Sequence, residues 1–319
     1  MLIKLLKEKW ESLIQRFGRQ RVVTLMWLNF VAVTALIIQI LIRTNLHQSA
    51  LLYILVPYGV SILIAWFRSY SAPKDKPESY LSRMVSATIF FVATSMVLQE
   101  GFICVLFFMP IYYLVMTLAY IWALLGKEDD KNRLSSFFFP VAILFMSLEG
   151  TNEMLSFSRD THVVVTKEVN LSVDEVKANL AKPFDLRSDR HWMIAIFPMP
   201  YRIDAGSLNE GDIHRIYTRY HRWFVTNTHY GEAELLIQSV SENRVKTRML
   251  SDTTFFSSYL KVYGTEINLD PVSNTQTKIS IRVDFKRHLD PAWYFQPLQK
   301  YGVTKMAEHL IKEVMVREN

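Results

Sequence analysis

The sequence lacks most of the features by which catalytic and metal-binding proteins are recognised. Its 319 residues include one cysteine, Cys104, so a disulfide framework and a cysteine-based zinc motif are both excluded. There is no G-x-S-x-G sequence, no phosphate-binding loop and no set of histidines at metal-ligand spacing. We therefore expect neither a cofactor nor a metal. The missing disulfides do not exclude an oxidising compartment.

The charge is unevenly distributed along the chain. Residues 1–159 hold 15 Lys and Arg against 10 Asp and Glu, whereas residues 160–319 hold 21 against 20. The basic excess accompanies the apolar half of the chain, which is typical of membrane orientation. Basic and aromatic residues interleave from His214 to Phe224, a pattern also found in nucleic-acid-binding proteins. Because the second half is nearly neutral, we expect no nucleic acid, and a rim for lipid headgroups is the better functional alternative.

The first half of the chain is predicted to lie in a membrane. Residues 1–21 have an apolar stripe and a basic face, which predicts an interfacial amphipathic helix. Residues 22–150 are predicted to form a transmembrane bundle of about five helices, and residues 151–160 a connector. The five apolar segments are Val22–Ile42, Ala50–Phe67, Met84–Leu98, Gly101–Leu125 and Leu134–Leu148. The third and fifth are short, so each could instead be re-entrant or interfacial.

The loop charges predict an orientation. Lys and Arg cluster in residues 1–21, 68–83 and 126–133. If the chain crosses a bacterial inner membrane five times, all three basic segments lie on the cytoplasmic side. The chain after Glu149 then lies on the outer side. Four spans would leave the C-terminal domain in the cytoplasm.

Two glutamates mark ends of predicted membrane segments. Glu100 and Glu149 end the third and fifth segments, and with five spans they emerge on the same face. Acids at membrane depth are candidates for a functional site. The simpler interpretation is that each marks the water boundary, with a following glycine as helix terminator.

The second half, residues 161–319, predicts an α+β domain. Ile279, Ile281, Val283 and Phe285 alternate with polar residues, as in an antiparallel strand with one buried face. The predicted order is a strand at 161–170, a helix that a capping box begins at Ser172, strands at 212–219, 222–229, 232–241, 244–250, 257–269 and 277–287, and a long helix. Asp290 and Pro291 suit a helix start, but Pro297 is expected to break it, so the main helix is predicted from Pro297 to Val316.

This order of elements resembles the SRPBCC superfamily, whose START-like and polyketide cyclase-like domains have a helix-grip fold. The resemblance rests on the 161–170 strand, the Ser172–Val176 helix start, the Lys278–Lys286 strand and the Leu289–Leu298 entry to the last helix. The membrane half is similar to that of uncharacterised bacterial membrane-anchored members at Glu100-Gly101, Cys104 and Pro110. The resemblance implies a sheet wrapped on the C-terminal helix, with a hydrophobic ligand between them. A shared fold does not imply a shared function.

We therefore expect a membrane-anchored, non-enzymatic protein that binds a lipid or other hydrophobic ligand, in transport or sensing. The predicted cavity residues are Trp192, Ile194, Tyr217, Trp223, Met249, Tyr263, Val283, Phe285, Phe295, Val303, Met306 and Leu310. One alternative is an enzyme of polyketide cyclase or dehydrase type, with His191 or Tyr263 as a proton shuttle. The other is a membrane-tethered interaction module whose interior is filled by its own side chains.

Overall fold

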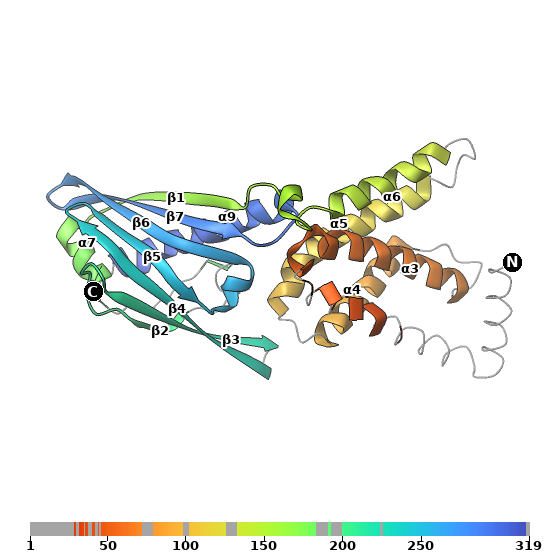
Figure 1. The fold of residues 1–319 in the computed structure, drawn as a ribbon, viewed down its shortest axis with the longest axis horizontal. Coiled ribbons are helices and arrows are strands. Elements are labelled where there is room, and N and C mark those ends of the chain that lie inside the picture. The colour runs from red at the N-terminus through yellow and green to blue at the C-terminus, as the bar shows by residue number, and fades with distance from the viewer. Residues whose placement is uncertain are drawn as a thin grey trace. The chain divides into compact units, whose positions relative to one another are not determined.

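The computed structural model describes residues 29, 32–34, 36, 37, 40, 41, 44, 46–71, 79–97, 102–125, 133–182, 191, 192, 200–223 and 226–316. The chain divides into two compact units, and Figure 1 shows the fold of each. The N-terminal unit comprises residues 1–47 and 51–148. The C-terminal unit comprises residues 149–319 together with residues 48–50.

The N-terminal unit is helical. The helices described there from residue 51 onward are η2 (Leu51–Leu55), α3 (Val56–Ser71), α4 (Tyr80–Val97), α5 (Phe102–Leu125) and α6 (Arg133–Ser147). Apolar residues of α3, α4 and α5 meet in a buried cluster that includes Ile64, Phe90 and Met116. Packing of helix on helix is therefore what holds this unit together.

The described residues contain one helix that is long and apolar enough to cross a bilayer, α5, in its stretch Val105–Trp122. The apolar stretches Leu51–Ile64 and Tyr80–Ala93 are shorter. Polar residues such as Arg83, Ser86 and Thr88 interrupt the second of these. The prediction of a five-span bundle is thus not supported. A buried core helix can have the same length and composition as a membrane span. The predicted helix at 1–21 and most of the segment at 22–42 lie outside the described residues.

The described part of the C-terminal unit is an antiparallel seven-stranded sheet with the helices α7 (Val173–Leu180) and α9 (Ala292–Leu310), which confirms the predicted α+β class. The strands are β1 (Asp160–Val169), β2 (Pro200–Asp204), β3 (Ile213–Trp223), β4 (Thr226–Ser241), β5 (Arg244–Asp252), β6 (Leu260–Ser273) and β7 (Gln276–Arg287). Their order across the sheet is β1-β7-β6-β5-β4-β3-β2. The first strand in the sequence therefore pairs with the last, as Figure 1 shows.

Two strand boundaries differ from the prediction. Residues 212–219 and 222–229 were expected as separate strands, and Gly231 was expected to end the second. Instead β3 continues to Trp223, and β4 runs through Gly231. Gly231 is needed for close approach rather than for a turn, because a Cβ there would lie 2.6 Å from the Cα of Thr254. Strand β2 was not among the predicted strands.

The sheet is only briefly paired between β5 and β6. The register joins Arg244, Val245 and Lys246 of β5 to β6 and extends no further along the described strands. Beyond that point the hydroxyls of Thr247 and Thr265 lie 2.8 Å apart and bridge the strands. A Cβ on Gly264 would collide with the carbonyl oxygen of Thr247 at 2.1 Å, so this crossing also needs a glycine.

Helix α7 (Val173–Leu180) begins as predicted. The side chain of Ser172 accepts a hydrogen bond from the backbone N–H of Glu175, and the Glu175 carboxylate accepts one from the backbone N–H of Ser172. This is the reciprocal pair of a capping box. The hydrogen bonds from Ser172 lower the pKa of the Glu175 carboxyl group.

Helix α9 (Ala292–Leu310) corrects two predictions at its start. It continues through Pro297, although the sequence predicted a break there. Proline lacks the N–H that would bond to the carbonyl of Trp293, yet the helix continues, with the Pro297 ring exposed to solvent. Pro291 is the N-cap and makes no side-chain capping bond, so Asp290 is not the predicted cap. The chain then continues as η5 (Ile311–Val316).

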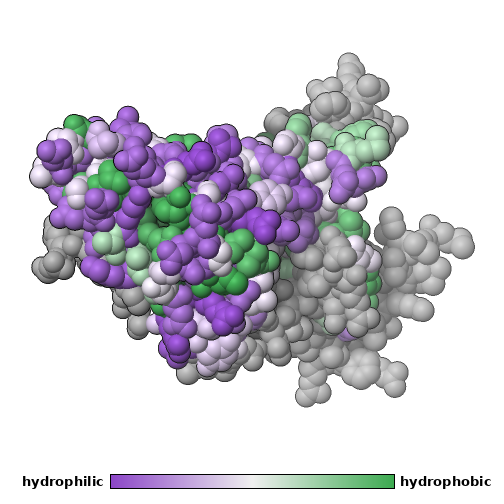
Figure 2. Space-filling view, turned by 60° about the vertical axis from the view of Figure 1, so that its left-hand side comes forward, coloured by the Kyte–Doolittle hydropathy of each residue, from purple (hydrophilic) through white to green (hydrophobic). Residues whose placement is uncertain are grey.

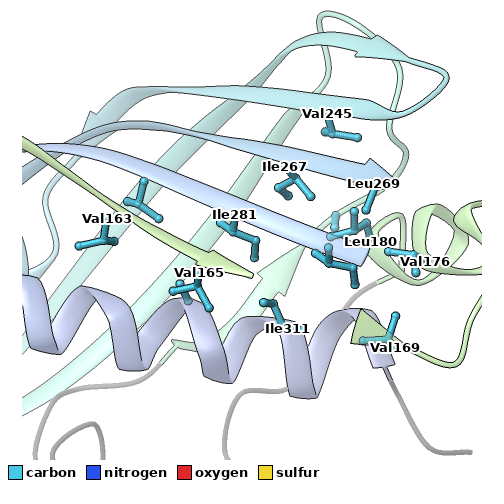
Figure 3. Packing of buried hydrophobic residues seen from close by; sticks show 14 of the residues in the cluster. Val163, Val165, Val169, Val176, Leu180, Val245, Ile267, Leu269, Ile281 and Ile311 are labelled. Atoms are coloured by element: carbon cyan, nitrogen blue, oxygen red, sulfur yellow. The ribbon is translucent and has the colours of Figure 1, made fainter. Parts of the chain in front are cut away.

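The core of the C-terminal unit lies between the sheet and the two helices. Helix α9 packs chiefly on β1 and β7. Figure 3 shows Val165 and Ile281 from these strands, and Ile311 from the end of the helix, in one packed layer. Val176 and Leu180 of α7 belong to the same cluster. The alternating residues of β7 that the sequence placed on one face are all buried here.

Candidate functional site

The candidate site is the interior between α9 and the inner face of the sheet. One stripe of α9 faces this interior, with Phe295, Gln299, Val303 and Ala307 at intervals of one helical turn. Phe295 and Ala307 are buried, with 1% and 3% of their surface exposed. Val303, with Met306 and Leu310 beside it, is only partly buried although it packs against the apolar cluster.

Six of the predicted cavity residues lie in this interior or at its end. Val283 and Phe285 are buried on the inner face of β7, and Phe295 is buried in the first turns of α9. Val303, Met306 and Leu310 are on the facing side of α9. Met249 is partly buried on β5, in alternation with buried Val245. Whether these residues enclose a ligand stays a prediction.

Other predicted cavity residues lie elsewhere. Tyr217 alternates with the buried residues Thr218 and Tyr220 along β3, and it contacts the guanidinium of Arg202 on β2 at 5.5 Å. Trp192 is 66% exposed. Ile194 and the side chain of Trp223 lie outside the described residues.

Neither residue named as a proton shuttle lies in the interior. Tyr263 is 40% exposed, and its hydroxyl donates a hydrogen bond of 2.7 Å to Asp160. That bond raises the pKa of Tyr263, which makes the phenol a poorer acid near neutral pH. The Nε2 atom of His191 lies 3.4 Å from the hydroxyl of Tyr301, an exposed residue of α9.

Gln299 is a polar side chain of α9 in this interior that the sequence analysis did not name. Gln299 donates a hydrogen bond of 3.0 Å from Nε2 to the carbonyl oxygen of Tyr259. Its Oε1 atom is buried and has no hydrogen-bond partner among the described residues. An amide oxygen without a partner is costly in an apolar environment. The helical spacing of Phe295, Gln299 and Val303 was the signal that could have found it.

A buried ionic cluster holds the start of α9. Arg287 and Asp290 are fully buried and form an ion pair. The second carboxylate oxygen of Asp290 accepts hydrogen bonds from Arg159 and from the hydroxyl of Ser156. Gly150, at φ +81°, adjoins the Asp290 carboxylate, and a Cβ at position 150 would clash with it. The sequence contains a signal that could have predicted this cluster. The alternation of residues along β7 puts Arg287 on the same buried face as Phe285.

Glu149, predicted as a membrane-face acid, belongs to this cluster. Its carboxylate accepts a hydrogen bond of 2.8 Å from the backbone N–H of Ala292, the first residue of α9, and lies 4.0 Å from Arg287. Burial raises the pKa of Glu149, the Ala292 hydrogen bond opposes that shift, and the neighbouring Asp290 adds to it. Glu100, the other predicted acid, lies outside the described residues.

A separate shallow hollow lies at the β2–β3 edge of the sheet and has a volume of about 500 Å³. Its walls are formed by Ile203, Asp204, Ala205, Gly206, Ile213 and Arg215. None of the predicted cavity residues belongs to it. In the part of the chain that the structure describes, no three metal-ligating side chains come together.

Comparison with solved structures finds START-like proteins at low similarity. A START superfamily protein from Mycobacterium smegmatis is 15% identical, with 47% of this chain and 92% of that chain covered and a TM-score of 0.32. Norcoclaurine synthase from Thalictrum flavum, in complex with dopamine and hydroxybenzaldehyde, is 13% identical, with 48% and 85% covered and a TM-score of 0.31. The Zhui aromatase/cyclase from Streptomyces sp. R1128 is 14% identical, with 48% and 85% covered and a TM-score of 0.27.

No protein-family model matches the chain, and a comparison with curated proteins finds no match. What is established is an antiparallel sheet with a long C-terminal helix.

Proposed function

We propose that this chain is a membrane-anchored protein that binds a lipid or other hydrophobic ligand between its sheet and α9. The observation that carries the proposal is the uneven burial along the inner stripe of α9. Phe295 and Ile311 close the two ends, whereas Val303, Met306 and Leu310 face the interior and remain partly accessible. Apolar residues that face a core and are not fully covered are the lining expected of a ligand site.

The binding mechanism is partition of apolar surface out of water. Each buried methylene of a ligand contributes about 0.8 kcal/mol, so an acyl chain needs few polar contacts. The unpaired Oε1 of Gln299 supplies one such contact, because it accepts a hydrogen bond from a hydroxyl or amide on the ligand. A ligand with a long apolar body and one donor is the chemical class that this interior suits best.

The proposed location is a bacterial inner membrane, with the N-terminus in the cytoplasm and the C-terminal unit outside. This orientation corresponds to five crossings, which would place the basic residues of 1–21, 68–83 and 126–133 on the cytoplasmic side. The number of crossings is itself a proposal, and the following labelling experiment tests the orientation directly. Asn274, in the exposed β6–β7 turn, is a suitable position for a labelling cysteine in a Cys104→Ser background. Labelling of intact cells supports the external location, and labelling only after the inner membrane is permeabilised contradicts it.

The binding site is tested by filling the interior. Val303→Trp adds volume on the inner stripe, and Tyr301→Trp is the matched control on an exposed position of the same helix. We expect the intact parent protein to co-purify with lipid detectable by mass spectrometry. We expect Val303→Trp to lose this lipid and to melt at the temperature of the lipid-free parent protein, while the control keeps the lipid and the melting temperature of the loaded parent.

In a solid core the same substitution has a different result, because overpacking costs about 1–3 kcal/mol. A large fall in melting temperature for Val303→Trp, together with a parent protein that carries no lipid, would refute the binding site. That outcome would favour an interaction module with a filled interior.

A further inference from the structure

Exposed apolar side chains gather at one end of the C-terminal unit. Met154, Leu155 and Phe157 of the connector are 91%, 51% and 70% exposed, and Trp293 in the first turn of α9 is 46% exposed. We call these four residues the apolar lip. Figure 2 shows, for one face, a mainly hydrophilic described surface with apolar patches on it. Contiguous exposed apolar residues mark interaction sites.

The lip is held in place by the buried ionic cluster. The backbone N–H of Gly150 donates to the carbonyl oxygen of Leu155, and Arg287 donates to that of Phe157 at 3.4 Å. Glu149 caps Ala292, the neighbour of Trp293. The residues of the lip are therefore exposed although their backbone is anchored, and a side chain on an anchored backbone loses little entropy when it binds.

Lysines flank the lip on the adjoining strands. Lys261 of β6 pairs in register with Lys286 of β7, and Lys286 pairs with Asp160, three residues after Phe157. Like charges opposite each other are unfavourable in a sheet, and the single carboxylate of Asp160 opposite Lys286 offsets only part of the charge of the two lysines. Anionic lipid headgroups would neutralise the positive charge that remains.

The chain before the lip is also exposed and apolar. Leu144, Phe145 and Met146, in the last turn of α6, are 51%, 70% and 46% exposed, and seven residues separate Met146 from Met154. Trp and Phe, both present in the lip, are the residues that favour the interface of a bilayer.

We propose that Met154, Leu155, Phe157 and Trp293 insert into the interfacial layer of a lipid bilayer, with Lys261 and Lys286 against anionic headgroups. This inference rests on the membrane location given under the proposed function. It adds a specific contact by which the C-terminal unit is held with the start of α9 at the bilayer surface. The closed end of the interior formed by Phe295 then lies next to the membrane.

The inference is tested on the full chain with Cys104 replaced by serine, reconstituted in vesicles of phosphatidylcholine with and without phosphatidylglycerol. A bimane probe is attached at Phe157→Cys or, as a matched control, at Val272→Cys. Val272 is an exposed apolar residue of the β6–β7 hairpin, and the 12 residues of β7 put it about 36 Å from the lip. Lipids with a nitroxide on the acyl chain serve as the quencher.

We expect a blue shift and a loss of bimane emission at position 157, larger with phosphatidylglycerol, and neither change at position 272. Replacing Lys261 and Lys286 with glutamate should remove the phosphatidylglycerol dependence. Protein that floats with the vesicles but shows no quenching at 157 overturns the lip and leaves the membrane location intact. Cross-linking between copies through position 157, with no quenching, assigns the lip to self-association instead. Protein that does not float contradicts the membrane location, and the lip with it.

Discussion

The two ends of α9 are held by opposite kinds of interaction. The first turn is fixed by a buried cluster of charges, in which Arg287, Asp290, Arg159 and Glu149 meet. The second half is held by apolar contacts with the inner face of β1 and β7, around Ile281 and Val165. Directional charge contacts permit one geometry, whereas apolar contacts tolerate changes of volume and partner.

This difference assigns the two ends different roles. The charged end joins the connector, the last strand and the helix at one point, and removing any member leaves a buried group without its partner. The apolar end can exchange a side-chain contact for a ligand contact at little cost. A ligand is therefore expected to bind against the second half of α9. The orientation of the C-terminal unit at the membrane is expected to depend on the charged first turn of α9.

The largest effect is expected from breaking the charged end. Asp290→Ala leaves the guanidinium of Arg287 buried without its carboxylate, and the cost to the free energy of unfolding should be about 3–5 kcal/mol. Chemical denaturation of the variant and its parent measures this cost. The matched control is Asp284→Ala, which removes an exposed ion pair with Arg282 on the same strand.

The exposed pair should contribute at most about 1 kcal/mol, because water solvates and screens both charges. Equal destabilisation by Asp290→Ala and Asp284→Ala would remove the distinction between the two ends of α9.

A smaller effect is expected at the apolar end. Ile281 is fully buried in the layer against α9, and Ile281→Val removes one methylene. The cost should be about 0.5–1.5 kcal/mol in the absence of ligand, measured by the same denaturation experiment. A cost near that of Asp290→Ala would show that this half is as intolerant of change as the charged end.

The smallest effect is a pH dependence confined to the charged end. Burial lowers the pKa of His288, and the nearby charges of Lys286, Arg159 and Lys261 lower it further, against the effect of a hydrogen bond to the Ser257 carbonyl. The unfolded chain then binds the proton at higher pH than the folded chain does. The stabilising contribution is complete above the unfolded pKa of about 6.5 and is lost as pH falls towards the folded value.

The measurement for His288 is the free energy of unfolding as a function of pH between 5 and 8, a range in which histidine titrates. His288→Gln should flatten this dependence, and His162→Gln, at an exposed position on β1, should leave it unchanged. An identical pH slope in the parent and in His288→Gln would contradict the prediction. Glu149 acts in the opposite sense, since its raised pKa makes the folded state lose stability as pH rises, so only the difference between variants is interpreted.

Much of the C-terminal unit follows from local rules that the sequence displays. The alternation of Ile279 to Phe285 determines a strand with one buried face, and the capping box at Ser172 determines where α7 begins. Both signals depend on residues within a few positions of each other, so no tertiary contact is needed to interpret them. Val303, Met306 and Leu310, which the sequence assigned to the cavity, lie on or beside the inner stripe of α9.

The errors have a common cause in contacts between residues far apart in the sequence. Gly231 was interpreted as a strand end, but its role is set by Thr254 on the neighbouring segment. Asp290 was interpreted as a local helix cap, but its carboxylate bonds to Arg159, 131 residues earlier. Tyr263 was assigned to the cavity, although its hydroxyl reaches Asp160 on another strand.

The sequence by itself therefore determined the class of fold, the order of the main elements and the apolar stripe of the long helix. Only the tertiary structure decided what holds the start of α9, which polar atom lies unpaired in the interior and which apolar residues remain exposed. The physical reason is that periodicity records which face of an element is apolar. A buried charge such as Asp290 takes its role from partners that folding brings to it.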